Sequence, residues 1–242
     1  EAQEGPNSEA LIAPLAALGL RYREDGATVR AAAATHRALE IVRVNEGLYT
    51  LDQASLIRQL IQNAESLGDH EAAWDLEQQL LRLAERNPGD SRTARILRDS
   101  ADRRMDVLER YSKGEFPPEI VLGCYYATPM PAERVDDAGH LVPPRPPNGV
   151  NTSCGSGNPD RAKQNILNEA QTYYSQAVNI IVCNERYASE ELPALFSAII
   201  ESSYLYGNPQ LARRSLSYLL AYQNTIGEPW LARIDTLVQI AD

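Results

Sequence analysis

The 242-residue chain has few sulfur-containing residues and few large aromatic ones apart from tyrosine: 3 cysteines, 2 methionines, 2 tryptophans and 2 phenylalanines. It also lacks long apolar runs. Segments such as Ala194–Ile200 fall far short of the roughly 20 residues that a membrane-spanning helix needs, so we expect no transmembrane segment. Hydrophobic residues make up 43% and charged residues 23%, which excludes a disordered or collagen-like chain. The net charge of −10 would repel a phosphate backbone, so we expect no nucleic-acid partner.

Catalytic and cofactor motifs are missing as well. There is no Gly-x-Ser-x-Gly, no phosphate-binding glycine loop and no His-Glu-x-x-His. His36, His70 and His140 are scattered, and none has metal-ligand spacing to another histidine or a cysteine. We therefore expect no catalytic, cofactor-binding or metal-binding residues and a protein that is not an enzyme. An enzyme with an unrecognised site is the alternative, because catalytic groups assemble in space rather than in sequence.

An internal duplication is the most informative feature of the sequence. Gly68-Asp69 and Gly207-Asn208 lie 139 residues apart, and this offset aligns a long stretch without a gap. Several residues are identical at this offset: Ala38 and Ala177, Ile41 and Ile180, Asn45-Glu46 and Asn184-Glu185, Leu56 and Leu195, Ala73 and Ala212, Leu80-Leu81 and Leu219-Leu220. The sequence thus predicts two copies of one helical unit. We interpret the repeated asparagine as a buried structural residue that ties a helix end to the next turn.

Each copy shows the three- and four-residue apolar spacing of helices that are buried on one face. In the first copy this spacing predicts helices over 31–46 and, after a Thr50-x-x-Gln53 capping box, over 54–67. Two more follow, one ended by Asn87-Pro88-Gly89 and one over 91–111. Shorter helices are expected over 8–23 and 229–240. The predicted fold class is therefore all-α, with antiparallel helix pairs in two duplicated units.

Between the two copies lies a segment of different composition. Residues 113–160 hold 9 of the 15 prolines, which exclude helix over most of the segment. Within it, residues 133–135 and 140–142 flank a glycine-bearing turn and predict a small β-hairpin. The chain then divides into a first helical unit (1–112), a Pro/Gly-rich insert (113–160) and a second helical unit (161–242), which together form one continuous solenoid-like domain. Ordered loops of this length tend to be functional, so we expect Tyr125 and Tyr126 to contact a partner.

The cysteines bear on the cellular compartment. Cys124 and Cys154 flank the proline-rich stretch and predict a disulfide that closes a loop of about 30 residues, worth roughly 3–4 kcal/mol. Cys183 is predicted to be buried, since its counterpart in the first copy is the apolar Val44. The chain begins at Glu1 rather than methionine, as expected of an exported protein whose signal peptide has been removed. We expect a periplasmic or extracellular protein, with a reduced, cytoplasmic protein as the alternative.

The helix pairs resemble a degenerate form of the tetratricopeptide repeat. The resemblance is carried by Leu60, Gly68 and Ala73, and again by Ile199, Gly207 and Ala212. In that family a small residue on the second helix of a pair lets the two helices pack closely. The resemblance implies a helical scaffold with a binding surface, usually for another protein.

Polar residues on the second predicted helix are candidates for that surface. They share a position facing away from the Leu56/Leu60 stripe: Arg58, Gln59, Gln62 and Asn63. The arginine-rich helix over 91–111 could also receive an acidic partner, but pairs such as Arg95–Asp99 and Arg98–Asp102 favour a salt-bridged, solvated face. The leading hypothesis is a non-enzymatic, exported scaffold that binds another protein. The alternative is a structural subunit of a larger assembly, held by the insert and by the tyrosine-rich second half.

Overall fold

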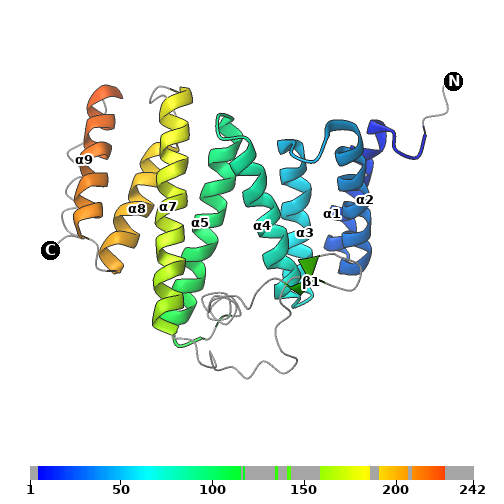
Figure 1. The fold of residues 1–242 in the computed structure, drawn as a ribbon, viewed down its shortest axis with the longest axis horizontal. Coiled ribbons are helices and arrows are strands. Elements are labelled where there is room, and N and C mark those ends of the chain that lie inside the picture. Colours follow the sequence, from blue (N-terminus) through cyan, green and yellow to red (C-terminus); the bar gives the residue numbers. More distant parts are fainter. Residues whose placement is uncertain are drawn as a thin grey trace.

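The protein is a row of helical hairpins (Figure 1). The computed structural model describes residues 5–115, 117, 134–135, 141–142, 159–185, 191–206 and 209–226. The helices of this part are α1 (Ile12–Glu24), α2 (Thr28–Glu46), α3 (Ala54–Ser66), α4 (His70–Arg86), α5 (Ser91–Ser112), α7 (Pro159–Glu185), α8 (Leu192–Leu205) and α9 (Pro209–Ile226). Short 3₁₀ turns precede α1 (Glu9–Leu11) and α3 (Leu51–Gln53). The predicted all-α fold is confirmed.

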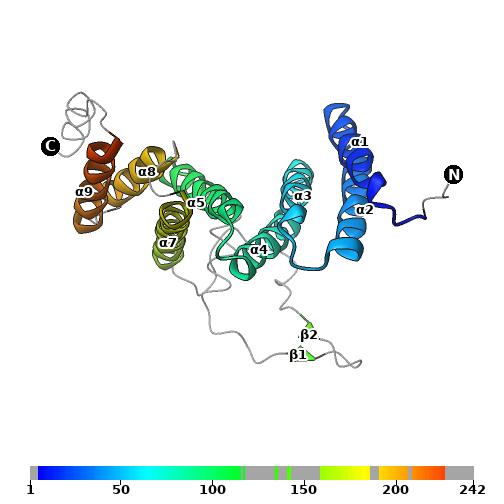
Figure 2. The same ribbon diagram turned by 90° about the horizontal axis from the view of Figure 1, so that it is seen from above.

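The helices pack most extensively in the pairs α1–α2, α3–α4, α5–α7 and α8–α9. Each pair contacts the next through a smaller junction, which is the arrangement of a solenoid. Seen from above, α3 and α5 lie on one side of the row, whereas α4 and α7 lie on the other (Figure 2). Helices α5 and α7 therefore form one hairpin, although residues 113–158 separate them in the sequence.

A shorter repeat than the predicted duplication is visible in the first two hairpins. Gly26 and Gly68 lie 42 residues apart, and each ends a turn between paired helices with a positive φ, 74° and 72°. Most residues other than glycine are strained in this conformation, so the two glycines allow equivalent tight turns in the two hairpins. The first hairpin also depends on Gly19, because a Cβ there would lie 2.4 Å from the Thr35 hydroxyl oxygen of α2.

Asparagines at the ends of the second helices follow the same period. Asn45 Nδ2 donates to the carbonyl oxygens of Ile41 and Asn7, both at 2.9 Å, and Asn87 Nδ2 donates to those of Leu83 and Tyr49, both at 2.8 Å. Asn184 Nδ2 donates to the carbonyl oxygen of Gly89 at 3.2 Å. Each asparagine thus ties the end of its own helix to the loop that precedes its hairpin. The predicted structural role is confirmed. However, Asn45 and Asn184 are exposed rather than buried, and the asparagines bond to a preceding loop rather than to the next turn.

The 139-residue duplication agrees with the helix order. At that offset the end of α2 falls on the end of α7, and α3 and α4 fall on α8 and α9 within one residue at each end. The duplication therefore relates a three-helix stretch of the first two hairpins to the same stretch of the last two. Most of the buried apolar residues from α2 to α9 form one cluster, in which Ala73 is 8% exposed and Ala212 is 0% exposed.

Other details confirm or correct the predictions. The β-hairpin is confirmed as an antiparallel pairing of β1 (Arg134–Val135) with β2 (Leu141–Val142). The Thr50–Gln53 capping box is wrong: the Thr50 hydroxyl accepts from the Asp52 amide and opens a 3₁₀ turn. The Gln53 side chain instead donates to the Gly47 carbonyl oxygen.

The predicted burial of Cys183 is also wrong, because the thiol is exposed. Its counterpart Val44 is itself 65% exposed, so the inference failed at the premise that an apolar residue is buried. The predicted Cys124–Cys154 disulfide, the tyrosines Tyr125 and Tyr126 and the helix over 229–240 lie outside the described residues. None of the described helices is long and apolar enough to cross a membrane.

Candidate functional site

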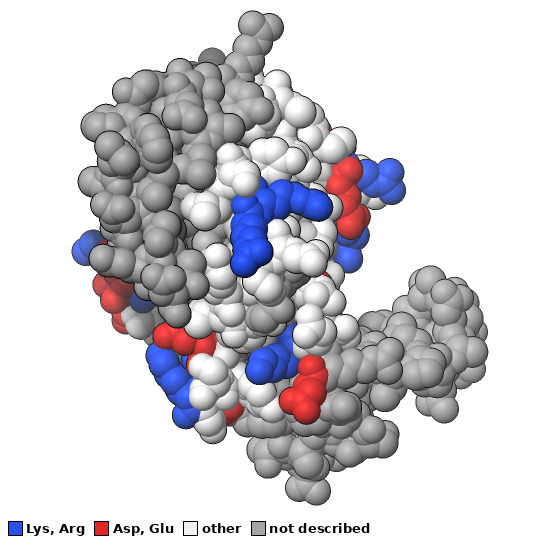
Figure 3. Space-filling view, turned by 90° about the vertical axis from the view of Figure 1, so that its left-hand side faces the viewer, with Lys and Arg blue, Asp and Glu red and all other residues white. Residues whose placement is uncertain are grey.

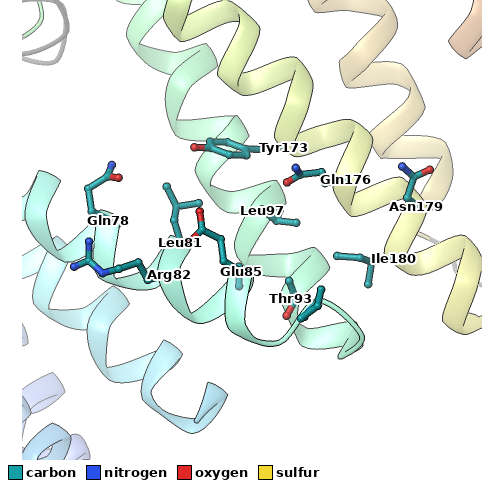
Figure 4. A pocket seen from close by; sticks show the side chains of 12 residues that line it. Gln78, Leu81, Arg82, Glu85, Thr93, Leu97, Tyr173, Gln176, Asn179 and Ile180 are labelled. Carbon is teal, nitrogen blue, oxygen red and sulfur yellow. The ribbon is translucent and has the colours of Figure 1, made fainter. Parts of the chain in front are cut away.

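A groove of about 410 Å³ runs between α4 and α7, above α5 (Figure 4). This volume falls in the range of ligand-binding pockets. The lining residues come from three helices and the turn after α4: Gln78, Leu81, Arg82, Ala84, Glu85, Pro88, Thr93, Leu97, Tyr173, Gln176, Asn179 and Ile180.

The two walls present matching rows of polar side chains. On α4 the row consists of Gln78, Arg82 and Glu85, and on α7 the facing row includes Gln176 and Asn179 (Figure 4). These rows follow from three- and four-residue spacing, which places successive side chains on one helix face. The floor is apolar and buried, because Leu81 on α4 and Leu97 on α5 belong to the main core cluster.

The polar groups on the walls have spare bonding capacity. Within the described part of the chain, the amides of Gln78, Gln176 and Asn179 make no side-chain hydrogen bond. Arg82 and Glu85 likewise form no ion pair with a described residue, although both are exposed. An amide side chain offers two donor hydrogens and an acceptor oxygen. The groove therefore combines an apolar floor with walls that can donate and accept.

A buried charge cluster lies further along α5. The Arg104 side chain is 4% exposed, and its guanidinium lies 2.8 Å from a carboxylate oxygen of Glu77 on α4 and 2.7 Å from one of Glu169 on α7. It also lies over the rings of Trp74 on α4, at 5.7 Å from the centroid, and of Tyr173 on α7, at 4.9 Å. Tyr173 is the one residue shared by this cluster and the groove lining.

The electrostatics keep Arg104 protonated and Tyr173 neutral. Burial lowers the pKa of Arg104, but the carboxylates of Glu77 and Glu169 outweigh it, so the pKa lies above its ordinary value. Burial raises the pKa of Tyr173, although the positive charge of Arg104 opposes the shift. The Tyr173 hydroxyl at the groove is therefore neutral near pH 7 and can donate a hydrogen bond.

The polar residues predicted on α3 make contacts inside the protein. Arg58 Nε lies 2.8 Å from an Asp99 carboxylate oxygen on α5, and the Gln62 side-chain oxygen accepts from Arg23 near the end of α1. Gln59 lies 3.5 Å from the Thr35 hydroxyl on α2. Asn63 is 2% exposed, so it does not face solvent as expected. These contacts attach α3 to its neighbours, and a partner-binding role for the four residues stays a prediction.

The arginines of α5 behave differently from a solvated face. The Arg98–Asp102 pair is confirmed at 3.7 Å, whereas the expected Arg95–Asp99 pair is wrong, because Asp99 contacts Arg58. Arg103 pairs with Glu65 on α3, and Arg104 is buried. The helix thus joins α3, α4 and α7 through charges. A second hollow, between α3, α4 and α5, is lined largely by such charged side chains.

Among the described residues, no cluster of three or more histidine, cysteine, aspartate or glutamate side chains is placed to hold a metal ion. Sequence reasoning missed the groove, because its walls come from helices some 90 residues apart that meet only when α7 pairs with α5. The usable signal was two rows of polar side chains at helical spacing, Gln78 with Arg82 and Gln176 with Asn179.

No family model matches the sequence, and no curated protein matches it. Among solved structures, the chain is similar to "Crystal structure of BtubC (BKLC) from P. vanneervenii", with 15% sequence identity and a TM-score of 0.49. The similarity covers 94% of this chain and 68% of that chain.

Proposed function

We propose that the protein is a non-enzymatic scaffold that binds a segment of another protein in the α4–α7 groove. The observation that carries the proposal is the set of amides on the two walls, the half-buried Gln78 and the exposed Gln176 and Asn179. They lack partners among the described residues and lie above an apolar floor. Surface amides are individually ordinary. Their convergence on one groove from two helices is what favours a ligand with both donors and acceptors.

An extended peptide fits these walls better than a helix does. The backbone N–H and C=O groups of a helix are already paired, whereas an extended segment brings unpaired groups that need partners. Each wall row spans seven residue steps, from Gln78 to Glu85 and from Tyr173 to Ile180. That is about 10 Å of helix, or about three residues of extended chain. Leu81, Leu97 and Ile180 would then surround one apolar side chain of the ligand.

We further propose that the scaffold is tetratricopeptide-like. The observation that supports this assignment is the burial of Ala73, the small residue of the second helix, where α4 packs on α3. The 42-residue period of the first two hairpins is longer than the roughly 34 residues of that family, so the proposed resemblance is to a degenerate form. The exported location and the Cys124–Cys154 disulfide belong to the same proposal. The disulfide is tested by counting alkylated thiols by intact mass under non-reducing conditions. One alkylated thiol is expected with the disulfide and three without it.

The binding proposal can be tested by selecting displayed random linear heptapeptides on the full chain. Selected peptides are then titrated calorimetrically into wild type and into Gln78→Ala/Gln176→Ala. Since each hydrogen bond contributes about 1 kcal/mol, we expect the double variant to bind about tenfold more weakly or worse. The matched control is Asn165→Ala/Gln210→Ala, which removes two exposed amides outside the groove and should bind like wild type. Selected peptides that bind all three proteins equally, or no enrichment at all, would contradict the proposal.

A further inference from the structure

One side chain, further along α5 than the groove floor, joins the two helices that form the groove walls. Arg104 projects from α5 and contacts two groups on each wall helix: Glu77 and Trp74 on α4, and Glu169 and Tyr173 on α7. Its fifth partner is the carbonyl oxygen of Ser100, which accepts at 3.2 Å within α5 itself. The guanidinium thus bridges α4 and α7.

Such an arrangement resists change in the distance between the two helices. A buried charge is costly unless it is paired and hydrogen-bonded, so moving α4 away from α7 would strip Arg104 of one carboxylate. The Glu77 side chain is 5% exposed and would lose its closest partner, leaving Arg103 at 3.7 Å. Arginine suits this position because its planar fork can bond two carboxylates while its faces stack on rings.

The cluster lies close enough to the groove to set its shape. Arg104 follows the floor residue Leu97 by seven residues, which is about 10 Å along α5. Tyr173 belongs to both the cluster and the groove lining, so Arg104 contacts a ring that also lines the groove (Figure 4 labels Tyr173).

We infer that Arg104 is a positioning residue that fixes the separation of α4 and α7 and thereby the width of the groove. It limits the size of the ligand side chain that fits beside Tyr173. The inference rests on the proposed function for the statement that the groove binds a ligand, but the separation of the helices is a property of the free protein. It can therefore be tested without any ligand.

The test is a distance measurement between spin labels on the two walls. Labels are attached through p-acetylphenylalanine at Arg82 and Asn179, both exposed, and the distance distribution is recorded by pulsed electron paramagnetic resonance. The variant Arg104→Met/Glu77→Met/Glu169→Gln removes the whole charge cluster, so that no unpaired charge remains buried. We expect it to fold, as circular dichroism will show, and to give a longer and broader distribution than wild type.

A second variant keeps the test decisive if the triple variant does not fold. Glu169→Gln alters only the carboxylate whose side chain is 43% exposed, and it should shift the distribution in the same direction by a smaller amount. The matched control, Arg58→Met/Asp99→Asn, removes an ion pair that joins α3 to α5 and should leave the α4–α7 distance unchanged. An unchanged distribution in the folded cluster variants, or an equal shift in the control, overturns the inference. A failed peptide selection would overturn the proposed function and leave this result intact.

Discussion

The middle of the row and its C-terminal end use the same helical hairpin but are held together differently. At the middle, α4, α5 and α7 meet around Arg104. Ion pairs join Arg103 and Arg104 of α5 to Glu77 of α4, and Arg104 to Glu169 of α7. At the end, α8 and α9 contain only three charged residues, Glu201, Arg213 and Arg214. At the centre of the surface seen from that end, basic and uncharged groups predominate, and the acidic groups lie nearer its edges (Figure 3). Packing there depends on buried apolar residues such as Leu195, Phe196 and Ala212.

This difference has a functional consequence. Apolar contacts are non-directional, so the sizes of the packed side chains set the separation of α8 and α9, without specific paired groups. Charged groups that are buried and paired tolerate less displacement, which suits the two helices that form the walls of a groove. The comparison predicts that substitutions at the two junctions cause different losses in the free energy of unfolding and affect different helices.

The largest effect is expected from Arg104→Ala. The substitution leaves Glu77 buried without its closest partner, and breaking a buried pair in this way costs about 3–5 kcal/mol. Urea unfolding monitored by circular dichroism measures the loss. Arg92→Ala is the control, because the ion pairs of Arg92 with Asp52 and Asp90 are exposed and should contribute little. Equal losses in the two variants would show that the burial of Arg104 is not what matters.

At the C-terminal junction the most sensitive position is Ala212. This residue is 0% exposed, and Ala212→Leu should overpack the α8–α9 pair and cost about 1–3 kcal/mol. Ala73→Leu should cost no more, since Ala73 retains 8% exposure. Gln210→Leu, at an exposed position of α9, serves as the control. If Ala212→Leu were as stable as wild type in the same unfolding assay, the close packing of α8 and α9 would be contradicted.

The asparagine that ties the second hairpin to the preceding loop should have a smaller effect. Asn87→Ala removes two hydrogen bonds to carbonyl oxygens, and we expect a loss of about 1 kcal/mol. Asn179→Ala removes an exposed amide without a described partner and should leave the free energy of unfolding unchanged. If Asn179→Ala lowered the free energy of unfolding as much as Asn87→Ala, this interpretation would be contradicted.

One further effect is absent at neutral pH and appears only at high pH. Burial raises the pKa of Tyr174, and its hydroxyl donates to an Asp102 carboxylate oxygen at 2.7 Å, which raises the pKa further. The folded state therefore retains this proton above pH 10, where an unfolded tyrosine loses it. Stability should be unaffected below that pH and should fall above it by up to about 1.4 kcal/mol per pH unit. Tyr174→Phe should reduce this slope, as melting curves between pH 8 and 11 will show; an unaltered slope would contradict the assignment.

Helix positions could be predicted from the sequence because apolar spacing records which face is buried. The bounds of α4 and α5 match their turn signals, Asn87-Pro88-Gly89 and the arginine-rich run from Ser91. The 42-residue period was also readable, since Gly26 repeats at Gly68 and Asn45 at Asn87. It was masked by the longer duplication, in which more residues are identical.

The site could not be predicted in this way. Periodicity says that a polar residue lies off the buried stripe, but not which neighbouring helix covers it. Arg58 and Gln62 therefore looked available for a partner, whereas they contact Asp99 and Arg23. Arg104 looked like one more surface arginine, because its burial depends on Glu169, a residue 65 positions away in α7. Pairing of α5 with α7 across the insert is a tertiary fact that local spacing does not contain.

Hydrogen exchange measured by mass spectrometry on Arg104→Met and Ala212→Leu tests most directly whether the two junctions are held independently. In a row of hairpins each unit contacts only its neighbours, so local damage should stay local. The account predicts faster exchange in α4, α5 and α7 for Arg104→Met, with α8 and α9 close to wild type, and the reverse pattern for Ala212→Leu. Faster exchange spread evenly over all helices in both variants would contradict it.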